Sequence, residues 1–266
     1  MKILVKILLI ILWIAIAAGV VVMMSFANVS HEVKQCRGIT CRIDYQGTQA
    51  LMSGNDLIAA INKNFGKPQS KTIGEVDIAG ISSFVKKNPY LENTDVLITV
   101  EGDILIRADQ CVPVIRYYSS AGYPHYIDKK GRIMPVNPVY PYKILIASGQ
   151  IESPLKDGRN IFSVSDSNFV LKAKLKNLYD IHLLAEIINT DSTLKALVEQ
   201  VYVTANGKIQ LVTKAGSHII YMGDTTDAAE KLENLKCFYK KGLVKTGWNK
   251  YKKLNLEYKN QIVCTK

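Results

Sequence analysis

The sequence lacks the local motifs of the common enzyme classes. It has no GxSxG, no HExxH, no Walker loop and no GxGxxG after an expected strand. Its four histidines are scattered, and each has a simple explanation as a surface or half-buried ring. No cysteines and histidines occur at zinc-binding spacing. We therefore predict a non-enzymatic protein with no catalytic residues, no metal, no cofactor and no small-molecule substrate.

Cysteine is scarce as well. Five cysteines are too few for a disulfide scaffold, and their number is odd. Cys36 and Cys41 could form a bridge if they lay on facing segments, but buried or free thiols explain them equally well. The sequence leaves both possibilities open.

Acidic side chains are outnumbered by basic ones. The chain has 34 Lys and Arg against 23 Asp and Glu, a net charge of +11. The excess is largest in residues 236–266, which contain nine lysines and one acid, Glu257. A basic surface can attract nucleic acid, anionic lipid or an acidic partner, or can simply keep a protein soluble. Nucleic acid is the poorest of these partners if the body lies outside the cytoplasm, and we predict none.

Only one apolar run approaches the length of a membrane span. Eighteen apolar or small residues extend from Ile7 through Trp13 to Met24 without a charge. As a helix they would be about 27 Å long, close to the ~30 Å hydrocarbon core of a bilayer. Adjoining residues complete the length, so we predict a transmembrane helix over residues 7–27, after a tail of residues 1–6.

Two other interpretations of this run stay open. A cleaved signal peptide also has a basic start and an apolar core, and cleavage after Ala17 would fit a small-x-small site. Against cleavage, the apolar run continues to Met24. A buried soluble helix would need a polar face, which this run lacks. Basic residues lie on both sides of the run, so charge only weakly favours a large domain outside the cytoplasm.

The pattern up to residue 109 predicts a small α+β unit. In chain order the expected elements are a strand over 38–45, a helix capped by Ser53 and Asp56, a helix over 77–87, and strands over 95–100 and 104–109. Glu101-Gly102-Asp103 would join the last two strands in a tight hairpin. This order predicts both helices on one face of a three-stranded sheet.

From Cys111 onward, strand patterns dominate. The expected strands cover residues 114–118, 123–127, 133–135, 143–147, 198–204, 208–213, 219–222 and 254–264, and the expected helices cover residues 175–188 and a segment opening at Asp227. Leu254, Leu256 and Tyr258 alternate with polar residues, which predicts one final strand. A strand that ends a chain often lies at a sheet edge, where it can accept another chain's strand.

Five groups of residues carry a family resemblance. They are Lys87-Asn88-Pro89-Tyr90-Leu91-Glu92-Asn93 with Asp95-Val96; Tyr126-Ile127-Asp128 with Gly131 and Met134-Pro135; Lys236 with Phe238-Tyr239; Gly247-Trp248 with Tyr251; and Tyr258-Lys259-Asn260-Gln261-Ile262-Val263-Cys264. In this order, and behind an N-terminal span, they resemble the bacterial division protein family FtsQ, called DivIB in some bacteria, in its Bacteroidetes-like form. The resemblance covers essentially the whole chain.

The resemblance implies a domain organisation and a location. A stalk of residues 28–35 would lead into a POTRA domain over residues 36–110, and a so-called β domain, mainly β with flanking helices, would occupy residues 111–266. It also implies a cytoplasmic N-terminus and a periplasmic body, held at the inner membrane of the division septum. The expected fold class is α+β behind a single transmembrane helix.

The resemblance further implies a scaffold that links septal proteins. The POTRA domain would serve localisation and contacts with other division proteins, while the end of the β domain would pair with FtsB of an FtsB–FtsL coiled coil. Carried onto this sequence, the partner-binding strand holds Leu254, Leu256, Tyr258, Lys259, Asn260, Gln261 and Val263. We expect strand addition as the mechanism, and the lysine excess would suit an acidic partner.

Two alternative functions remain in view. A POTRA-bearing periplasmic chaperone or translocation component would receive unfolded client strands, although the sequence shows no repeated POTRA units. A membrane-anchored envelope enzyme would need a cleft in which an acid, a base or a nucleophile converge.

Overall fold

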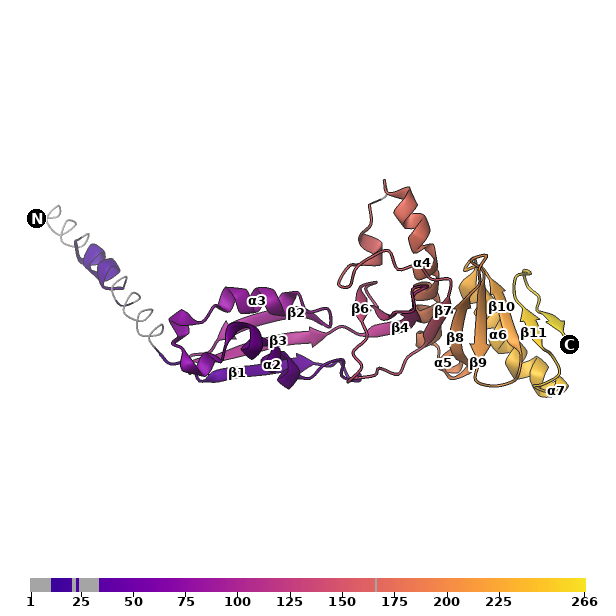
Figure 1. The fold of residues 1–266 in the computed structure, drawn as a ribbon, viewed down its shortest axis with the longest axis horizontal. Helices are drawn as coiled ribbons and strands as arrows, with labels where there is room; N and C mark the ends of the chain where they lie inside the picture. Colours follow the sequence, from indigo (N-terminus) through magenta and orange to yellow (C-terminus); the bar gives the residue numbers. More distant parts are fainter. Residues whose placement is uncertain (1–10, 21–22, 24–33, 166) are drawn as a thin grey trace, which may run out of the picture. The chain divides into compact units, whose positions relative to one another are not determined.

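The computed structural model describes residues 11–20, 23, 34–165 and 167–266. The chain forms two compact units (Figure 1). The N-terminal unit comprises the described residues up to 44 together with 52–87 and 91–109, and the C-terminal unit comprises 45–51, 88–90 and 110–266.

The predicted membrane span is only partly covered by the described residues. Ile7 and Met24 are among those not described, whereas residues 11–20 are helical and the Trp13 side chain is 68% exposed. Within the described ranges, no helix combines the length and apolar character needed to cross a bilayer. The span over residues 7–27 therefore stays a prediction.

The N-terminal unit has the predicted order of strand, two helices and two strands. Its elements are β1 (Gly38–Asp44), α2 (Gly54–Phe65), the 3-10 turns η1 (Pro68–Ser70) and η2 (Ile73–Glu75), α3 (Ile78–Lys86), β2 (Leu91–Ile98) and β3 (Asp103–Gln110). The strands form a sheet in the order β1-β3-β2, with β1 parallel to β3 and Ile39 opposite Ile104.

Local signals explain why these segments form. The Ser53 hydroxyl accepts a hydrogen bond from the Asp56 amide at 3.1 Å, and the Asp56 carboxylate accepts one from the Ser53 amide at 3.0 Å, which is the predicted capping box. α2 contacts β1, α3 contacts β2, and the two helices meet where the Phe65 and Phe84 rings lie 5.8 Å apart edge to face. Cys36 and Cys41 are free thiols in this unit, one buried and one half-buried.

The C-terminal unit is built on one nine-stranded sheet in the order β12-β11-β10-β9-β8-β7-β4-β5-β6. The strands are β4 (Pro113–Tyr118), β5 (Pro124–Asp128), β6 (Ile133–Pro135), β7 (Ile146–Gly149), β8 (Val198–Val203), β9 (Ile209–Thr213), β10 (Ile219–Gly223), β11 (Lys253–Asn255) and β12 (Val263–Thr265). The mixed α+β class is as predicted, but three pairings are parallel: β4 with β7, β7 with β8, and β10 with β11.

Helical segments make two of these parallel pairings possible, because parallel neighbours need a long crossover. The helices are η3 (Ile161–Ser163), α4 (Phe169–Thr190), α5 (Ser192–Leu197), α6 (Ala228–Phe238), the π-helical turn η4 (Tyr239–Leu243) and α7 (Val244–Thr246). α4 and α5 connect β7 to β8, while α6, η4 and α7 connect β10 to β11. Leu178, Ile181, Leu232 and Leu235 of these helices share one core with the strands.

Candidate protein-binding edge

The last strands of the C-terminal unit form a hairpin at one end of the sheet. β11 lies parallel to β10, with Leu254 opposite Ile220, and β12 runs back antiparallel, with Cys264 opposite Leu254. Leu254 and Leu256 are buried in the core and anchor the hairpin. We call residues 253–265 the C-terminal hairpin.

The prediction of one continuous strand over residues 254–264 is wrong. The chain leaves β11 after Asn255 and reverses before β12 begins at Val263. Asn255 accepts a hydrogen bond from the Glu257 amide at 2.9 Å, and Asn260 has a left-handed φ of 59°. Asparagine favours both features, because its short polar side chain bonds to nearby backbone and tolerates this conformation. These turns break the strand that the alternating pattern predicted.

The seven predicted partner-binding residues consequently divide into two groups. Leu254 and Leu256 are buried and face the core. The other five are exposed: Tyr258, Lys259, Asn260 and Gln261 lie in the loop, and Val263 lies in β12. Tyr258 is 53% exposed and Val263 is 43% exposed. Only the five exposed residues can contact another protein while this chain stays folded.

β12 is the terminal strand of the sheet on this side. In the described part of the chain, no strand pairs with its outer edge. Val263 and Thr265 are exposed, while Cys264 is half-buried against the core. An exposed edge of this kind presents backbone N–H and C=O groups that a strand from another chain can pair with.

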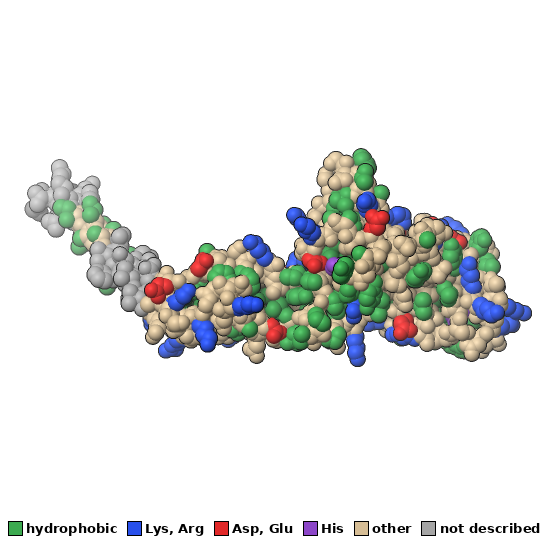
Figure 2. Space-filling view, viewed as in Figure 1, with side chains coloured by type: hydrophobic (Ala, Val, Ile, Leu, Met, Phe, Trp, Pro, Cys, Tyr) green, Lys and Arg blue, Asp and Glu red, His purple; other side chains and the backbone are tan. Residues whose placement is uncertain are grey.

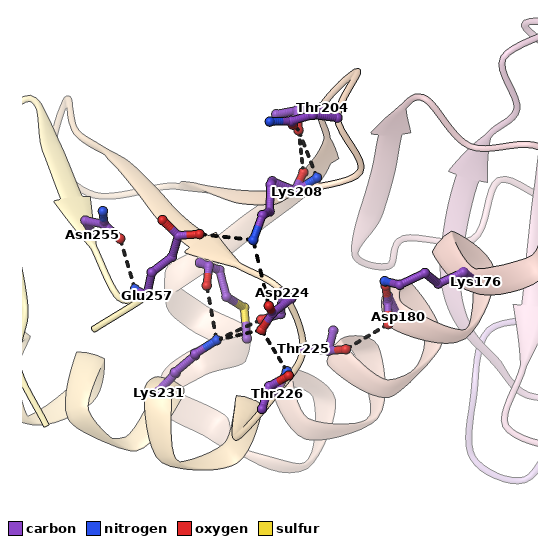
Figure 3. A network of polar contacts seen from close by, with 12 residues as sticks. Lys176, Asp180, Thr204, Lys208, Asp224, Thr225, Thr226, Lys231, Asn255 and Glu257 are labelled. Atoms are coloured by element: carbon purple, nitrogen blue, oxygen red, sulfur yellow. Dashed lines mark hydrogen bonds and ion pairs between the residues drawn. The ribbon is translucent and has the colours of Figure 1, made fainter. Parts of the chain in front are cut away.

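Ion pairs hold the hairpin loop against the rest of the sheet (Figure 3). Lys208 of the turn between β8 and β9 lies 3.2 Å from the Glu257 carboxylate and 3.8 Å from Asp224. Lys231 of α6 lies 3.2 Å from the other oxygen of Asp224, and it also donates to the Asp224 backbone carbonyl at 3.0 Å. The chain of charges therefore links β9, β10, α6 and the hairpin.

The electrostatics of this network follow from its hydrogen bonds. Lys231 donates to Asp224 and holds the pKa of that carboxyl below its usual value, whereas the bond to Glu257 raises the pKa of Lys208. Gly223 makes room for the arrangement, since it has a left-handed φ of 80° and a Cβ there would overlap the Glu257 side chain. The hydrogen-bonded ion pairs and the space left by Gly223 both favour one position of the hairpin loop.

A groove of about 240 Å³ lies between the hairpin loop and α6. Asp227, Glu230 and Asn234 line it from the helix, and Tyr258, Gln261 and Ile262 line it from the loop. α6 itself is fixed to α5, because Lys236 reaches Asp191, the N-cap of α5, at 2.6 Å. The groove therefore has one rigid wall beside the open edge.

Sequence reasoning missed Lys208, Asp224 and Lys231, which position the loop. Their partners are separated along the chain, so no spacing rule indicated them. Asn206-Gly207, which forms the turn between β8 and β9, was the one local signal that places Lys208 at a strand end.

The three histidines that the structure describes have structural surroundings, and two of them, His182 and His218, are buried, where surface or half-buried rings were predicted. His182 contacts the Asp128 carbonyl at 3.1 Å, His125 lies 3.5 Å from Asp157, and His218 contacts the Tyr239 hydroxyl. Across the described ranges, no group of three or more His, Cys, Asp or Glu is arranged to hold a metal ion.

Comparison with known proteins assigns the family. No curated protein matches this chain. The family described as FtsQ/DivIB, C-terminal related, matches residues 112–265, which is more than half of the chain and includes the whole C-terminal hairpin. This is a family of division-associated membrane proteins without enzymatic activity. The chain belongs to the FtsQ/DivIB C-terminal related family and has a role in cell division.

Proposed function

We propose that this protein is a single-span membrane scaffold of the bacterial division machinery, and that β12 binds an FtsB-like subunit of an FtsB–FtsL-like coiled coil. The observation that carries the proposal is the open sheet edge at β12. Val263 and Thr265 are exposed there, and the described residues supply no strand beyond it. An extended partner segment would extend the sheet by one strand.

The contacts divide between affinity and specificity. Backbone hydrogen bonds along β12 would supply affinity that does not depend on sequence. Because β12 spans only Val263–Thr265, a partner must also engage residues beyond it. Tyr258 and Gln261 are exposed in the adjoining loop and line the groove beside α6, so they are positioned to recognise partner side chains.

Charge would assist this association. Lys252, Lys253, Lys259 and Lys266 are exposed on or beside the hairpin. A partner segment rich in Asp and Glu would complement them, which mainly raises the association rate and makes it sensitive to salt.

The N-terminal unit would act as the second binding module. Its strand–helix–helix–strand–strand order and its β1-β3-β2 sheet support its assignment as a POTRA domain that contacts other septal proteins. The apolar run over residues 7–24 supports a membrane anchor. The family membership supports the proposed location at the inner membrane, with a cytoplasmic N-terminus and a periplasmic body.

Binding between the full chain in detergent and the FtsB-like protein of the same bacterium tests the interface. Tyr258→Glu should weaken binding roughly 30-fold or more, since loss of a central aromatic contact costs about 2 kcal/mol or more. Tyr123→Glu is the matched control, because Tyr123 is an exposed tyrosine far along the sheet from β12. Equal binding by both variants would move the interface away from the hairpin.

Depletion of the protein in its host tests the division role. Cells should elongate without completing septa, and expression of the Tyr258→Glu variant should not restore division while Tyr123→Glu should. Normal septation after depletion would contradict the scaffold role, whatever the binding result.

A further inference from the structure

A second surface of the C-terminal unit has features that strand addition at β12 does not use. We call residues 239–250 the basic tip; it consists of η4, α7 and the turn that follows. Its lysines are exposed, and none has an ion-pair partner in the part of the chain that the structure describes: Lys240, Lys241, Lys245 and Lys250. Figure 2 shows blue Lys and Arg side chains at the end of the unit that holds both the tip and the C-terminal hairpin.

Two large apolar side chains are exposed among these lysines. Val244 is 66% exposed and Trp248 is 41% exposed. The opposite side of the same segment is buried, because Tyr239 and Leu243 belong to the core. The tip is therefore a packed element that presents apolar and cationic groups together on its outer side.

The tip has a firm base. The Trp248 ring lies 5.4 Å from the Tyr239 ring, edge to face, and the Tyr239 hydroxyl contacts His218. The Gly247 amide donates to the Leu243 carbonyl at 2.8 Å and closes the last turn. Gly242 allows Phe238 to pack closely, since a Cβ there would lie 2.7 Å from the Phe238 ring.

We propose that the basic tip binds the surface of an anionic phospholipid bilayer. The lysine ammonium groups would pair with lipid phosphates, while Val244 and Trp248 would enter the boundary between headgroups and acyl chains. Tryptophan favours this boundary, because its ring is apolar and its N–H remains near water. Several lysines around such a group attract anionic lipid additively.

A bilayer fits the tip better than a water-soluble polyanion does. An acidic protein or a nucleic acid would neutralise the lysines but would not require Val244 and Trp248 to be exposed between them. A bilayer surface satisfies both the charge and the apolar side chains. Attachment to the same membrane, which is part of the proposed function, would keep the local lipid concentration high, so a weak contact would suffice.

The chain has two tryptophans, Trp13 and Trp248, and they allow the anchor and the tip to be tested separately. The full chain is reconstituted into vesicles of brominated phosphatidylglycerol or brominated phosphatidylcholine, and quenching of tryptophan emission reports contact with lipid. In the Trp13→Phe variant, the remaining Trp248 should be quenched in phosphatidylglycerol, and not in phosphatidylcholine or at high salt. In the Trp248→Phe variant, quenching of Trp13 in both lipids reports the anchor alone.

Charge-neutral variants test the role of the lysines. In the Trp13→Phe background, K240Q/K241Q/K245Q should weaken surface association on the order of 100-fold and abolish the quenching of Trp248. The matched control, K63Q/K67Q/K86Q, removes three exposed lysines of the N-terminal unit and should leave the quenching unchanged. An unchanged emission spectrum without vesicles shows that each variant retains its fold around Trp248.

Three results would overturn the proposal. They are no quenching of Trp248 by phosphatidylglycerol, equal quenching in neutral lipid, and quenching that persists after loss of the three lysines. If polyglutamate changes the Trp248 emission while lipid does not quench it, the tip is a protein-binding surface instead. Quenching of Trp13 alone would support the membrane anchor and contradict lipid binding by the tip. Quenching of neither tryptophan would contradict both proposals.

Discussion

The two edges of the nine-stranded sheet differ in whether another segment of the described chain covers them. At the β6 edge, Ile133 and Met134 are fully buried, and the segment around Arg159 pairs with the strand: the Ile133 amide donates to the Arg159 carbonyl at 2.9 Å, and the Gly158 amide donates to the Ile133 carbonyl at 2.8 Å. Pro135 ends β6 with a residue that has no N–H to offer.

In the described part of the chain, the β12 edge has neither a covering segment nor a proline. Val263 and Thr265 are exposed, and no described segment covers the strand. Natural sheets usually cover, shorten or interrupt their edges, because an open edge pairs with other chains. Both edge strands are three residues long, so the contrast lies in the segment that covers β6, and the proposed binding of a partner strand rests on the uncovered edge at β12.

Removal of side-chain volume should have its largest effect at the closed edge. Ile133→Ala removes a fully buried side chain and should lower the free energy of unfolding by about 3 kcal/mol. Val263→Ala, at the open edge, should lower it by less than about 1 kcal/mol because that side chain is 43% exposed. Urea unfolding followed by Trp248 fluorescence in a Trp13→Phe background measures both. Equal losses would contradict the distinction between the edges.

An intermediate effect on stability is expected at Asn160, which holds in place the segment that covers β6. Asn160 donates to the Lys130 carbonyl at 2.6 Å and accepts from the Phe162 amide at 2.7 Å as the N-cap of η3. Asn160→Ala should lower the free energy of unfolding by about 1 kcal/mol and should speed hydrogen exchange at the Ile133 amide. Asn168→Ala, which removes the N-cap of α4, provides a control for loss of a cap elsewhere. Unchanged exchange at Ile133 in the Asn160 variant would show that the cover does not depend on this residue.

The smallest effect is expected from the ion pairs beside the open edge. Because Lys231 lowers the pKa of Asp224, the folded state favours the carboxylate, and this stabilisation is present at neutral pH. It should be lost as the pH falls below about 4, the ordinary range of Asp, through the lowered pKa of the folded state. Asp224→Asn should remove this pH-dependent contribution and increase hydrogen exchange in the C-terminal hairpin slightly.

Glu230→Gln is the control for the Asp224 variant. It removes an exposed carboxylate that has no ion-pair partner within the described ranges. Its acid unfolding curve should follow that of the unmodified protein. If the Asp224 variant follows the same curve, the network does not hold the hairpin.

Local signals account for most of what could be predicted. The N-terminal unit was predicted in the correct order because caps, helical periodicity and a tight hairpin all lie within short stretches. The C-terminal hairpin was predicted as a single strand, because the alternation of Leu254, Leu256 and Tyr258 continues through the point where the chain turns. Asn255 and Asn260 carried the turn signal, and the alternation concealed it.

The sequence by itself determined the long apolar run at the N-terminus, the lysine excess after residue 236 and the identity of most helices and strands, since each depends on neighbouring residues. The tertiary structure alone decided the order of strands in the larger sheet. That order depends on α4 and α6 packing against strands far away in the chain, and it places β6 under cover while leaving β12 at an open edge. Contacts of this range leave no local pattern, so the open edge at β12, which we propose as the binding edge, became visible only in the folded protein.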